Sequence, residues 1–376
     1  MRSGALRIGV DGRAFASPAG GVRRYVSELY REILELPAVE VVAIGAPDNA
    51  PLPAGMQRRA ARAFPTNLGW MAMSLPLAFR GAGLDVFHAP AYSAPLWGVH
   101  PQVVTIHDVS YERRPEWNAY RNDPLRRRFY RASALAADRI VTDSTFSRDE
   151  IHAAYGIPSD RIDVIPLAAA SVFTPGACDP AALPPGVTQP YALHVGDLHV
   201  RRNLSTALDA ILRLRSLRNS PTHQFTNSPI VLVCAGIDRG VGPALAAQAR
   251  AAGDAAALAL TGPVDEHALL NLYRGAAMLL YPSRYEGFGL PILEAMQCGV
   301  PVAGSRSASI PELIGDAGVL VGELDVDGWT RAIVSLSTDA AHADAMRARG
   351  LARAATFSWA RTARETVEAL RRAVRA

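Results

Sequence analysis

Short apolar runs alternate with amphipathic stretches along most of the chain, which predicts alternating strands and helices. The first apolar run, residues 6–10, ends at Asp11 and is followed by a glycine-containing loop. From Val22 to Leu36, apolar residues recur at spacings of four and three, as on one face of a helix, and Pro37 ends the pattern. A strand, a loop and a helix in this order form the repeating unit of a parallel α/β sheet.

Further apolar runs of strand length fall into two series. Those of the first series are residues 41–44, 86–88, 103–106, 140–143 and 162–166. Those of the second series are residues 191–196, 230–235, 257–261, 278–281, 301–304 and 318–321. The stretch between the two series is rich in proline, alanine and glycine, which is typical of an interdomain linker. We therefore predict a first α/β domain at 1–175, a linker at 176–190 and a second α/β domain at 191–356.

The most informative local pattern follows the run 278–281, where the chain continues as PSRYEGFGLPILEAMQCGVPVAG. The loop after the run carries Glu286 and two glycines, and Pro291 suits the first turn of a short helix. Gly299 stands where a glycine commonly ends a helix, and the next proline prevents continuation. The pattern predicts a buried strand, a loop, a short helix and another strand.

The start of this short helix can bind an anion. The backbone N–H groups of Phe288, Gly289 and Leu290 lie at the helix N-terminus, where unpaired donors and the helix dipole favour a phosphate or diphosphate. Glu294, about one turn further on, suits the two hydroxyls of a ribose. Glu286 lies outside the helix and can face a sugar on the other side of the diphosphate. The alternative is a loop with two solvated glutamates.

The spacing Glu-x7-Glu within EGFGLPILEAMQCGVPV resembles the signature of the retaining family 4 glycosyltransferases of the GT-B fold. The resemblance implies two facing Rossmann-like, doubly wound domains with the active site in the interdomain cleft. It also implies that Glu294 holds the ribose of a nucleotide sugar and that Glu286 contacts the transferred hexose. The segment FSWARTARE resembles the end of such chains, so a helix in 357–376 is expected to pack back on the first domain.

Two features of the first domain are compared with the same family. Gly20 and Gly21 open the first helix, and the family places a comparable loop against the donor, although a tight turn explains the glycines equally well. His107 follows the run 103–106, and ligands of parallel sheets bind beyond the carboxyl ends of the strands. This histidine could exchange a proton near pH 7 or bond to a sugar hydroxyl, as many family members use a histidine here. A capping or structural histidine is the alternative.

Arg201 and Arg202 precede the first helix of the second domain, in the segment GDLHVRRN. An arginine beside a helix N-terminus can bind a diphosphate through two parallel hydrogen bonds. The family usually has arginine-lysine-asparagine here, so both arginines are expected at the donor phosphates. Many relatives also have an arginine directly after the strand glycine. This chain has Asp197 instead, which removes one expected phosphate contact.

The composition narrows the classes of function. Charged residues make up 20% and hydrophobic residues 49% of the chain, a globular balance. All 39 basic residues are arginine, and the net charge of +4 favours anionic partners. The three cysteines lie far apart, which fits a reducing cytoplasm. No run has the length of a membrane helix, no signal peptide is expected, and the glycine spacings do not match a dinucleotide fingerprint.

An Asp-x-Asp sequence occurs at residues 325–327 and is similar to the metal-binding motif of the other major glycosyltransferase fold. Its position at a predicted helix start indicates a different use, because aspartate is a favoured N-cap residue. We predict that Asp327 caps a helix from Gly328. The cysteines also lack metal-ligand spacing, so no metal site and no metal requirement are expected.

Two basic stretches lie beside apolar residues in the first domain. The first, residues 56–80, combines arginines with Trp70, Met71, Met73 and Leu75; the second runs from Arg113 to Arg131 and includes residues 126–128. Basic residues beside exposed apolar ones suit the surface of an anionic membrane. Solvated helix faces beside ordinary core residues are an equally good explanation at this point.

The resemblance and the residues together predict an enzyme that moves a hexose, with mannose expected first, from a GDP- or UDP-sugar to a hydroxyl of a glycan or lipid-linked acceptor. His107, Glu286 and Arg202 are the expected catalytic residues, and no nucleic-acid partner is expected. The predicted location is the cytoplasm, with peripheral attachment to the inner membrane face. The alternatives are a GT-B-like sugar-nucleotide epimerase and an inactive glycosyltransferase-like partner protein.

Overall fold

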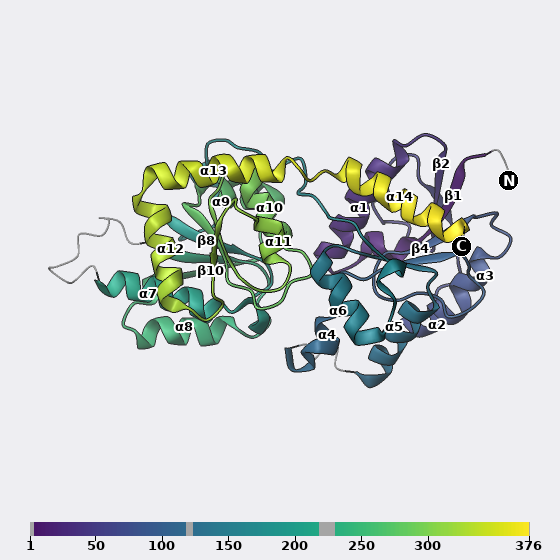
Figure 1. Cartoon of the computed structure of the whole chain (residues 1–376), viewed down its shortest axis with the longest axis horizontal. Coiled ribbons are helices and arrows are strands. Elements are labelled where there is room, and N and C mark those ends of the chain that lie inside the picture. The colour runs from purple at the N-terminus through teal and green to yellow at the C-terminus, as the bar shows by residue number, and fades with distance from the viewer. Residues whose placement is uncertain (1–3, 118–122, 218–229, 376) are drawn as a thin grey trace. The chain divides into compact units, whose positions relative to one another are not determined.

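A computed structural model describes residues 4–117, 123–217 and 230–375 of the chain. Its contacts divide the chain into two compact units (Figure 1). The N-terminal unit comprises Met1–Leu167 together with Ser358–Ala376, and the C-terminal unit comprises Ala168–Phe357.

The N-terminal unit is built on a parallel sheet of seven strands within the described residues, in the order β3-β2-β1-β4-β5-β6-β7. Its strands are β1 (Leu6–Asp11), β2 (Val39–Ile44), β3 (Gln57–Arg59), β4 (Val86–Ala89), β5 (Gln102–Thr105), β6 (Arg139–Thr142) and β7 (Ile162–Val164). The central strands β4 and β5 are buried throughout, as expected for a parallel sheet that is covered on both faces.

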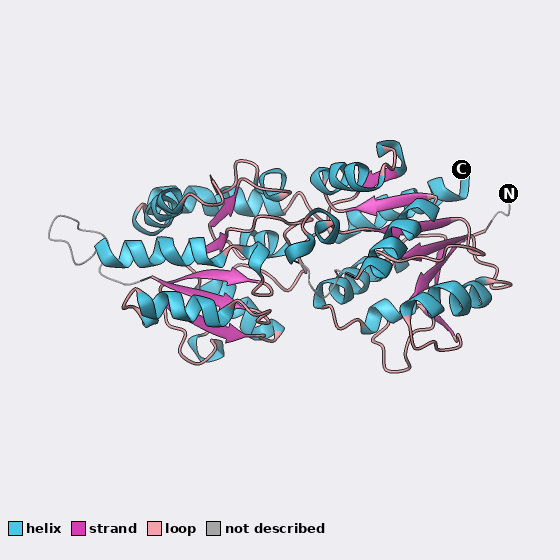
Figure 2. Cartoon of the chain, turned by 90° about the horizontal axis from the view of Figure 1, so that it is seen from below, coloured by secondary structure: helices cyan, strands magenta, loops and turns pink. Residues whose placement is uncertain are grey.

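Helices lie on both sides of this sheet (Figure 2). They are α1 (Gly20–Leu34), α2 (Asn67–Gly69), a π-helical turn (Trp70–Ser74), α3 (Leu75–Phe79), α4 (Ser110–Arg113), α5 (Pro124–Ala136), α6 (Thr145–Tyr155) and α14 (Trp359–Arg375). The last helix, α14, packs against α1 and against strands β4, β5 and β6. The C-terminal segment is therefore part of the N-terminal unit.

The C-terminal unit repeats the same arrangement with six strands among the described residues, in the order β10-β9-β8-β11-β12-β13. The strands, all parallel, are β8 (Tyr191–Val195), β9 (Val231–Ala235), β10 (Leu258–Gly262), β11 (Met278–Tyr281), β12 (Val302–Ser305) and β13 (Val319–Val321). The helices are α7 (Leu204–Leu217), α8 (Gly242–Ala251), α9 (Glu266–Gly275), α10 (Leu290–Gln297), α11 (Ile310–Ile314), α12 (Val326–Thr338) and α13 (Ala340–Ala354). The prediction of two Rossmann-like α/β domains is confirmed.

The structure places the boundary between the units earlier than the sequence suggested, at residues 167 and 168 rather than after 175. The stretch from Ala168 to Phe173 is mostly buried. Gln297 on α10 donates a hydrogen bond to the Ala170 carbonyl at 3.1 Å, and the Phe173 ring packs edge-on against Tyr273 of α9. Because these contacts attach the segment to the C-terminal unit, residues 168–175 do not belong to the first domain as predicted.

The structure corrects one local expectation and shows the burial of several residues that the sequence left open. The helix that was expected to start at Gly328 begins at Val326, and Asp325 is its N-cap, because its side chain accepts a hydrogen bond from the Gly328 N–H at 2.8 Å. Asp327 lies in the first turn instead and pairs with Arg213. In the first basic stretch, Trp70, Met71 and Leu75 are buried in the core, whereas Met73 is 52% exposed.

Candidate active site

The candidate site of the C-terminal unit lies where the strand order reverses. Strands β8 and β11 are neighbours, but the chain leaves them toward opposite edges of the sheet, to β9 and to β12. Ligands of doubly wound sheets bind at this switch point, beyond the carboxyl ends of the strands. Arg202 follows β8 and Glu286 follows β11, so the topology brings together two predicted residues that are 84 positions apart.

Arg202 and Glu286 form a buried ion pair. The Nη1 atom of Arg202 donates to Oε1 of Glu286 and, at 2.6 Å, to the hydroxyl of Tyr281. The two charged side chains are only 12% and 6% exposed. The Nε atom of Arg202 is buried and makes no hydrogen bond to any described residue. The guanidinium thus retains donor capacity toward an anionic ligand.

The aromatic ring of Tyr281 supports the same guanidinium. The guanidinium carbon (Cζ) of Arg202 lies 5.5 Å from the centroid of the Tyr281 ring, within the range of a cation–π interaction. His194 stacks on the Tyr281 ring with centroids 5.7 Å apart. Burial, and then the charge of Arg202, lower the pKa of His194 to about 3. At neutral pH His194 is an uncharged support, so it does not oppose the arginine with a second positive charge.

Asn203 fixes the position of the loop that carries Arg202. It adopts a left-handed conformation with φ of 53°, which asparagine tolerates better than most residues. Its side-chain amide donates to the carbonyls of Pro282 at 3.3 Å and Glu323 at 2.6 Å. These bonds join the loops that follow β8, β11 and β13. Asn203, the third residue of the RRN sequence, therefore positions Arg202, the second.

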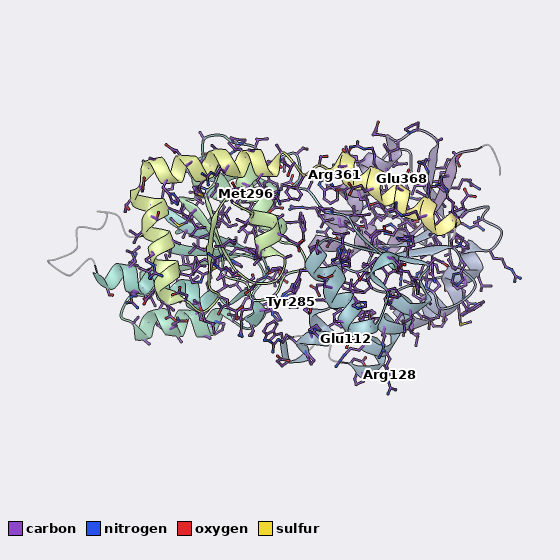
Figure 3. The ribbon with its side chains drawn as sticks, in the orientation of Figure 1. Glu112, Arg128, Tyr285, Met296, Arg361 and Glu368 are labelled. Carbon is purple, nitrogen blue, oxygen red and sulfur yellow. The ribbon has the colours of Figure 1, made fainter. Side chains whose placement is uncertain are left out.

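The loop before α10 has the conformation that the glycines and proline predicted. Gly289 is the N-cap residue with φ of 113°, a backbone conformation that favours glycine, and the helix begins at Leu290. The hydroxyl of Ser309 bonds to the carbonyls of Glu286 at 3.0 Å and Phe288 at 2.9 Å. These two bonds hold the loop in place. Tyr285, which is labelled in Figure 3, belongs to this loop. Its helix-start N–H groups remain suited to a phosphate.

Glu294 lies deeper than Glu286 and is only 2% exposed. Its Oε2 atom accepts a hydrogen bond of 2.7 Å from the hydroxyl of Tyr273. Burial, and then the charge of Glu294, raise the pKa of Tyr273 well above its ordinary value, so the tyrosine remains a donor. This bond orients one carboxylate oxygen. Tyr273 has the spacing of an ordinary core residue, so no sequence pattern distinguished it.

The N-terminal unit contains a histidine–aspartate pair at the ends of β5 and β6. Nδ1 of His107 lies 2.8 Å from Oδ2 of Asp143, and Asp143 is 3% exposed. Burial alone would lower the pKa of His107, but the charge and hydrogen bond of Asp143, together with the charge of Asp108, outweigh it and raise that pKa. The rings of Tyr25 and Tyr92 face His107 edge-on. His107 is thus an oriented imidazole that favours its charged form.

Gly20 and Gly21 lie at the exposed start of α1, and the helix has no side-chain N-cap bond. Neither glycine has a positive φ, and a Cβ atom added at either would meet nothing within 4 Å. A tight turn therefore does not require glycine at these positions. The role of the two glycines beside the donor stays a prediction.

The position of the missing arginine is occupied by a second ion pair. Oδ2 of Asp197 accepts a hydrogen bond of 2.9 Å from Nε of Arg239, which belongs to the loop after β9. The backbone N–H of Arg239 also bonds to the Leu198 carbonyl at 3.0 Å. The guanidinium of Arg239, from the loop after β9, therefore lies beside Asp197.

Comparisons with known proteins agree with this geometry. Residues 19–169 match the model described as Glycosyltransferase Family 4, and residues 189–339 match the one described as Glycosyl transferases group 1. An O-antigen chain mannosyltransferase B of Escherichia coli is 34% identical over 289 residues, which cover 76% of this chain and 73% of the relative. This chain belongs to the family 4 glycosyltransferases.

Solved structures show the same fold at lower identity. The sucrose-phosphate synthase of Thermosynechococcus elongatus has a TM-score of 0.75 at 20% identity, with 98% of each chain covered. The HepE protein of Anabaena, solved in complex with UDP-glucose, has a TM-score of 0.71 at 16% identity, with 98% of this chain and 99% of HepE covered. The GT-B fold predicted from the resemblance is confirmed, and this glycosyltransferase is an enzyme of the transferase class.

Sequence reasoning missed several residues of the candidate site. They are four buried partners of the predicted residues, Tyr281, Asn203, Tyr273 and Asp143, and the exposed Arg239 that pairs with Asp197. Only Asn203 carried a signal, as the last residue of the RRN sequence. The two catalytic candidates of the C-terminal unit, Arg202 and Glu286, are in direct contact.

Asp143→Asn is expected to shift the pH dependence of activity in this glycosyltransferase. The Asp143 carboxylate raises the pKa of His107. The imidazole therefore stays charged at pH values above its ordinary pKa and loses its proton as the pH rises through the raised pKa. In the variant, burial remains without the opposing charge, and the alkaline limb of kcat should move to lower pH. Titration of the His107 imidazole by NMR, beside the pH profile of kcat, checks this result. Identical profiles for the two proteins would contradict a role for charged His107.

Proposed function

We propose that this glycosyltransferase transfers mannose from GDP-mannose to a hydroxyl of a lipid-linked glycan during synthesis of a cell-surface polysaccharide, with retention of the anomeric configuration. The buried Arg202–Glu286 pair at the switch point carries the proposal, because it offers a cation to a leaving diphosphate and a carboxylate to a sugar. Mannose is chosen because the relative in Escherichia coli is described as an O-antigen chain mannosyltransferase. GDP is proposed as the nucleotide that carries the mannose, and a UDP-sugar is the competing donor.

The donor diphosphate is proposed to bind between Arg202 and the N–H groups at the start of α10. A buried charge without a partner is costly, so Glu286 neutralises Arg202 in the absence of donor. A diphosphate would take over the guanidinium through charge-assisted hydrogen bonds. Glu286 would then be released toward the hydroxyls of the hexose. Arg201 and the exposed glycines Gly20 and Gly21 are assigned to the same donor.

Departure of the nucleoside diphosphate is the step that the protein must accelerate. The leaving group gains negative charge while the sugar becomes oxocarbenium-like, and a fixed cation aimed at that charge stabilises the transition state. Attack by the acceptor on the face that the diphosphate leaves preserves the anomeric configuration. Glu286 is not proposed as a nucleophile of the kind found in retaining glycosidases, because it is assigned to the hydroxyls of the hexose and not to its anomeric carbon. His107 is proposed to bond to a sugar hydroxyl.

We further propose that transfer needs no divalent metal, because Arg202 and the α10 N–H groups provide the positive charge that a metal ion provides in other enzymes. The test is nucleotide release from a panel of GDP-, UDP- and ADP-sugars in excess EDTA, followed by mass spectrometry. We expect GDP release from GDP-mannose at an undiminished rate when a glycan acceptor is present. Loss of activity with EDTA and its recovery with magnesium would refute metal independence, and an epimerised donor without transfer would support an epimerase instead.

We propose that the enzyme acts in the cytoplasm, at the inner face of the membrane, where a lipid-linked acceptor is held. The three cysteines are free thiols, which fits a reducing compartment. No helix among the described residues has the length and apolar character needed to cross a bilayer.

A further inference from the structure

Four buried side chains near His107 are joined by hydrogen bonds inside the N-terminal unit. The hydroxyl of Tyr30 on α1 lies 2.7 Å from Nδ1 of His88 on β4. Nε2 of His88 lies 2.8 Å from the hydroxyl of Thr105, the last residue of β5. The same hydroxyl lies 3.0 Å from that of Tyr25, which also belongs to α1. These bonds connect α1, β4 and β5 within the core.

His88 is uncharged at neutral pH and is bonded at both ring nitrogens. Burial, and then the charge of His107, lower the pKa of His88 to about 3. A neutral imidazole has one N–H and one acceptor nitrogen, and a hydroxyl both donates and accepts. Each bond of the chain therefore has a donor and an acceptor. Removal of one hydroxyl would leave a buried polar group without its partner.

Thr105 is bonded to both tyrosines whose rings face His107. Its hydroxyl bonds to Tyr25, and its carbonyl accepts a hydrogen bond of 3.0 Å from the backbone N–H of Tyr92. Tyr92 has φ of 56°, a backbone conformation that is uncommon for a large residue and needs support from its surroundings. The ring centroids of Tyr25 and Tyr92 lie 4.8 Å and 6.0 Å from that of His107, with interplanar angles of 86° and 73°.

The bond to Asp143 fixes only one nitrogen of His107. Nδ1 lies 2.8 Å from Asp143, whereas Nε2 makes no hydrogen bond to a described residue. An imidazole that is bonded at one nitrogen can still turn about that bond. Aromatic pairs prefer edge-to-face arrangements, so the two tyrosine rings restrict this rotation. The direction in which Nε2 points thus depends on the tyrosines.

We propose that Thr105 is a positioning residue for His107 and acts through the rings of Tyr25 and Tyr92. Its hydroxyl holds the first ring and its carbonyl holds the loop that carries the second. His88 completes the arrangement by bonding to the same hydroxyl from β4. Without the hydroxyl, Tyr25 loses its hydrogen-bond partner, its ring is free to shift, and the imidazole loses one of its two supports.

Thr105 acts on the geometry of His107 and not on the charges around it. Among the described residues, the titratable groups that face His107 are Asp143 at the end of β6, the adjacent Asp108, His88 on β4, Tyr25 on α1 and Tyr92 in the loop after β4. The two aspartates supply the charge that raises the pKa of His107. Burial raises the pKa of Tyr25, which stays protonated. A displaced imidazole would bond less well to Asp143, so its pKa would fall.

The experiment compares the titration of the His107 imidazole by NMR in the wild type and in Thr105→Val, without donor. The chain has nine histidines, so loss of one signal in His107→Gln identifies it. We expect the pKa of His107 to fall by roughly 0.5–1 pH unit, as for loss of an aromatic contact. Thr105→Ser, which keeps the hydroxyl, should restore the wild-type value. Tyr25→Phe should cause a smaller fall, because the ring remains but its hydrogen bond is lost.

The effect on turnover rests on the proposed function, whereas the titration does not. In Thr105→Val, kcat should fall by roughly 10- to 100-fold, as for a displaced catalytic group, and its alkaline limb should move to lower pH. The affinity for GDP, measured by calorimetry, should be unchanged. If the wild type releases no GDP from GDP-mannose, the proposed function fails, and the pKa of His107 in the variants still decides the role of Thr105.

Two matched variants separate positioning from stability. Tyr30→Phe removes a buried hydroxyl from the same helix, at the far end of the chain of bonds. Thr330→Val makes the same change as Thr105→Val on α12 of the other unit, where the hydroxyl donates to the Val326 carbonyl at 2.9 Å. Both should lower the melting temperature and leave the pKa of His107 and kcat as in the wild type.

Three results would overturn the proposal. They are an unchanged pKa of His107 in both Thr105→Val and Tyr25→Phe, an equal fall of that pKa in the two matched variants, and an unchanged kcat of an active Thr105→Val enzyme. If Thr105→Val does not fold, Tyr25→Phe decides by the same criteria.

Discussion

Arg202→Ala is expected to lower kcat by about 10² to 10³, the effect of removing one donor that stabilises charge in a transition state. The side chain is 12% exposed, touches Glu286 and Tyr281, and has a buried Nε atom with no bond to a described residue. Its positive charge is therefore held at the switch point where the diphosphate is proposed to depart. Arg202→Lys should retain more activity, since lysine keeps the charge but lacks the planar fork. Single-turnover rates at saturating donor give the comparison.

Loss of Arg202 also leaves a buried carboxylate unpaired, which costs about 3–5 kcal/mol of stability for a fully buried pair. Arg215 provides the matched control, because it forms a two-bond ion pair with Asp254 and is also 12% exposed, but it lies at the other end of α7. Arg215→Ala should lower the melting temperature and leave kcat unchanged at a temperature where the protein is folded. Equal losses of kcat in the two alanine variants would show that the arginine acts only on stability.

Glu294→Gln is expected to weaken binding of the free nucleoside diphosphate by about 10- to 150-fold, as for loss of a hydrogen bond to a charged group worth roughly 1.5–3 kcal/mol. The Glu294 carboxylate is buried, and the hydroxyl of Tyr273 fixes its orientation. It is therefore held in one position and is not surrounded by water. Tyr273→Phe should produce a smaller loss in the same direction. Titration calorimetry with GDP measures both.

Glu286→Gln is the matched variant for this comparison, because it makes the same chemical change at the other acid of the motif. In the proposed exchange, Glu286 competes with the diphosphate for Arg202. Its neutralisation should therefore leave GDP affinity unchanged or increase it, while transfer of the hexose falls. Equal weakening of GDP binding by the two glutamine variants would contradict the separate assignment of ribose and hexose.

The strands and the loop of the central motif could be predicted because their signals are local. The apolar run 278–281 matches β11, and Gly289 and Gly299 adopt the positive φ values that their positions require. Pro291 stands in the first turn of α10, as its fixed φ allows. Each of these features depends on a few consecutive residues, so the sequence alone was sufficient.

The partners of the predicted residues could not be found in this way, because they depend on strand order. His107 and Asp143 are 36 residues apart and meet only because β5 and β6 are neighbours. Tyr273 and Glu294, 21 residues apart, meet because α9 packs on β8 and α10 packs on the neighbouring strand β11. A periodic pattern shows that Tyr273 is buried but not which carboxylate it faces.

The sequence did not show which apolar residues of 56–80 are buried, because the helix in this stretch is irregular. The π-helical turn at Trp70–Ser74 widens the repeat, so a regular spacing of 3.6 residues does not describe which side chains share a face. Trp70 and Leu75 consequently enter the core, while Leu68 and Leu77 are exposed. The basic character of the stretch was visible in the sequence, but the apolar residues that accompany it on the surface were not.

The central claim is retaining transfer from a nucleotide sugar, and the configuration of the product tests it most directly. The enzyme is incubated with GDP-α-mannose and a lipid-linked saccharide acceptor, and the new linkage is examined by NMR. We expect one mannose joined to the acceptor through an α linkage, with one GDP released for each bond formed. A β linkage, or consumption of GDP-mannose without a new glycosidic bond to the acceptor, would contradict it.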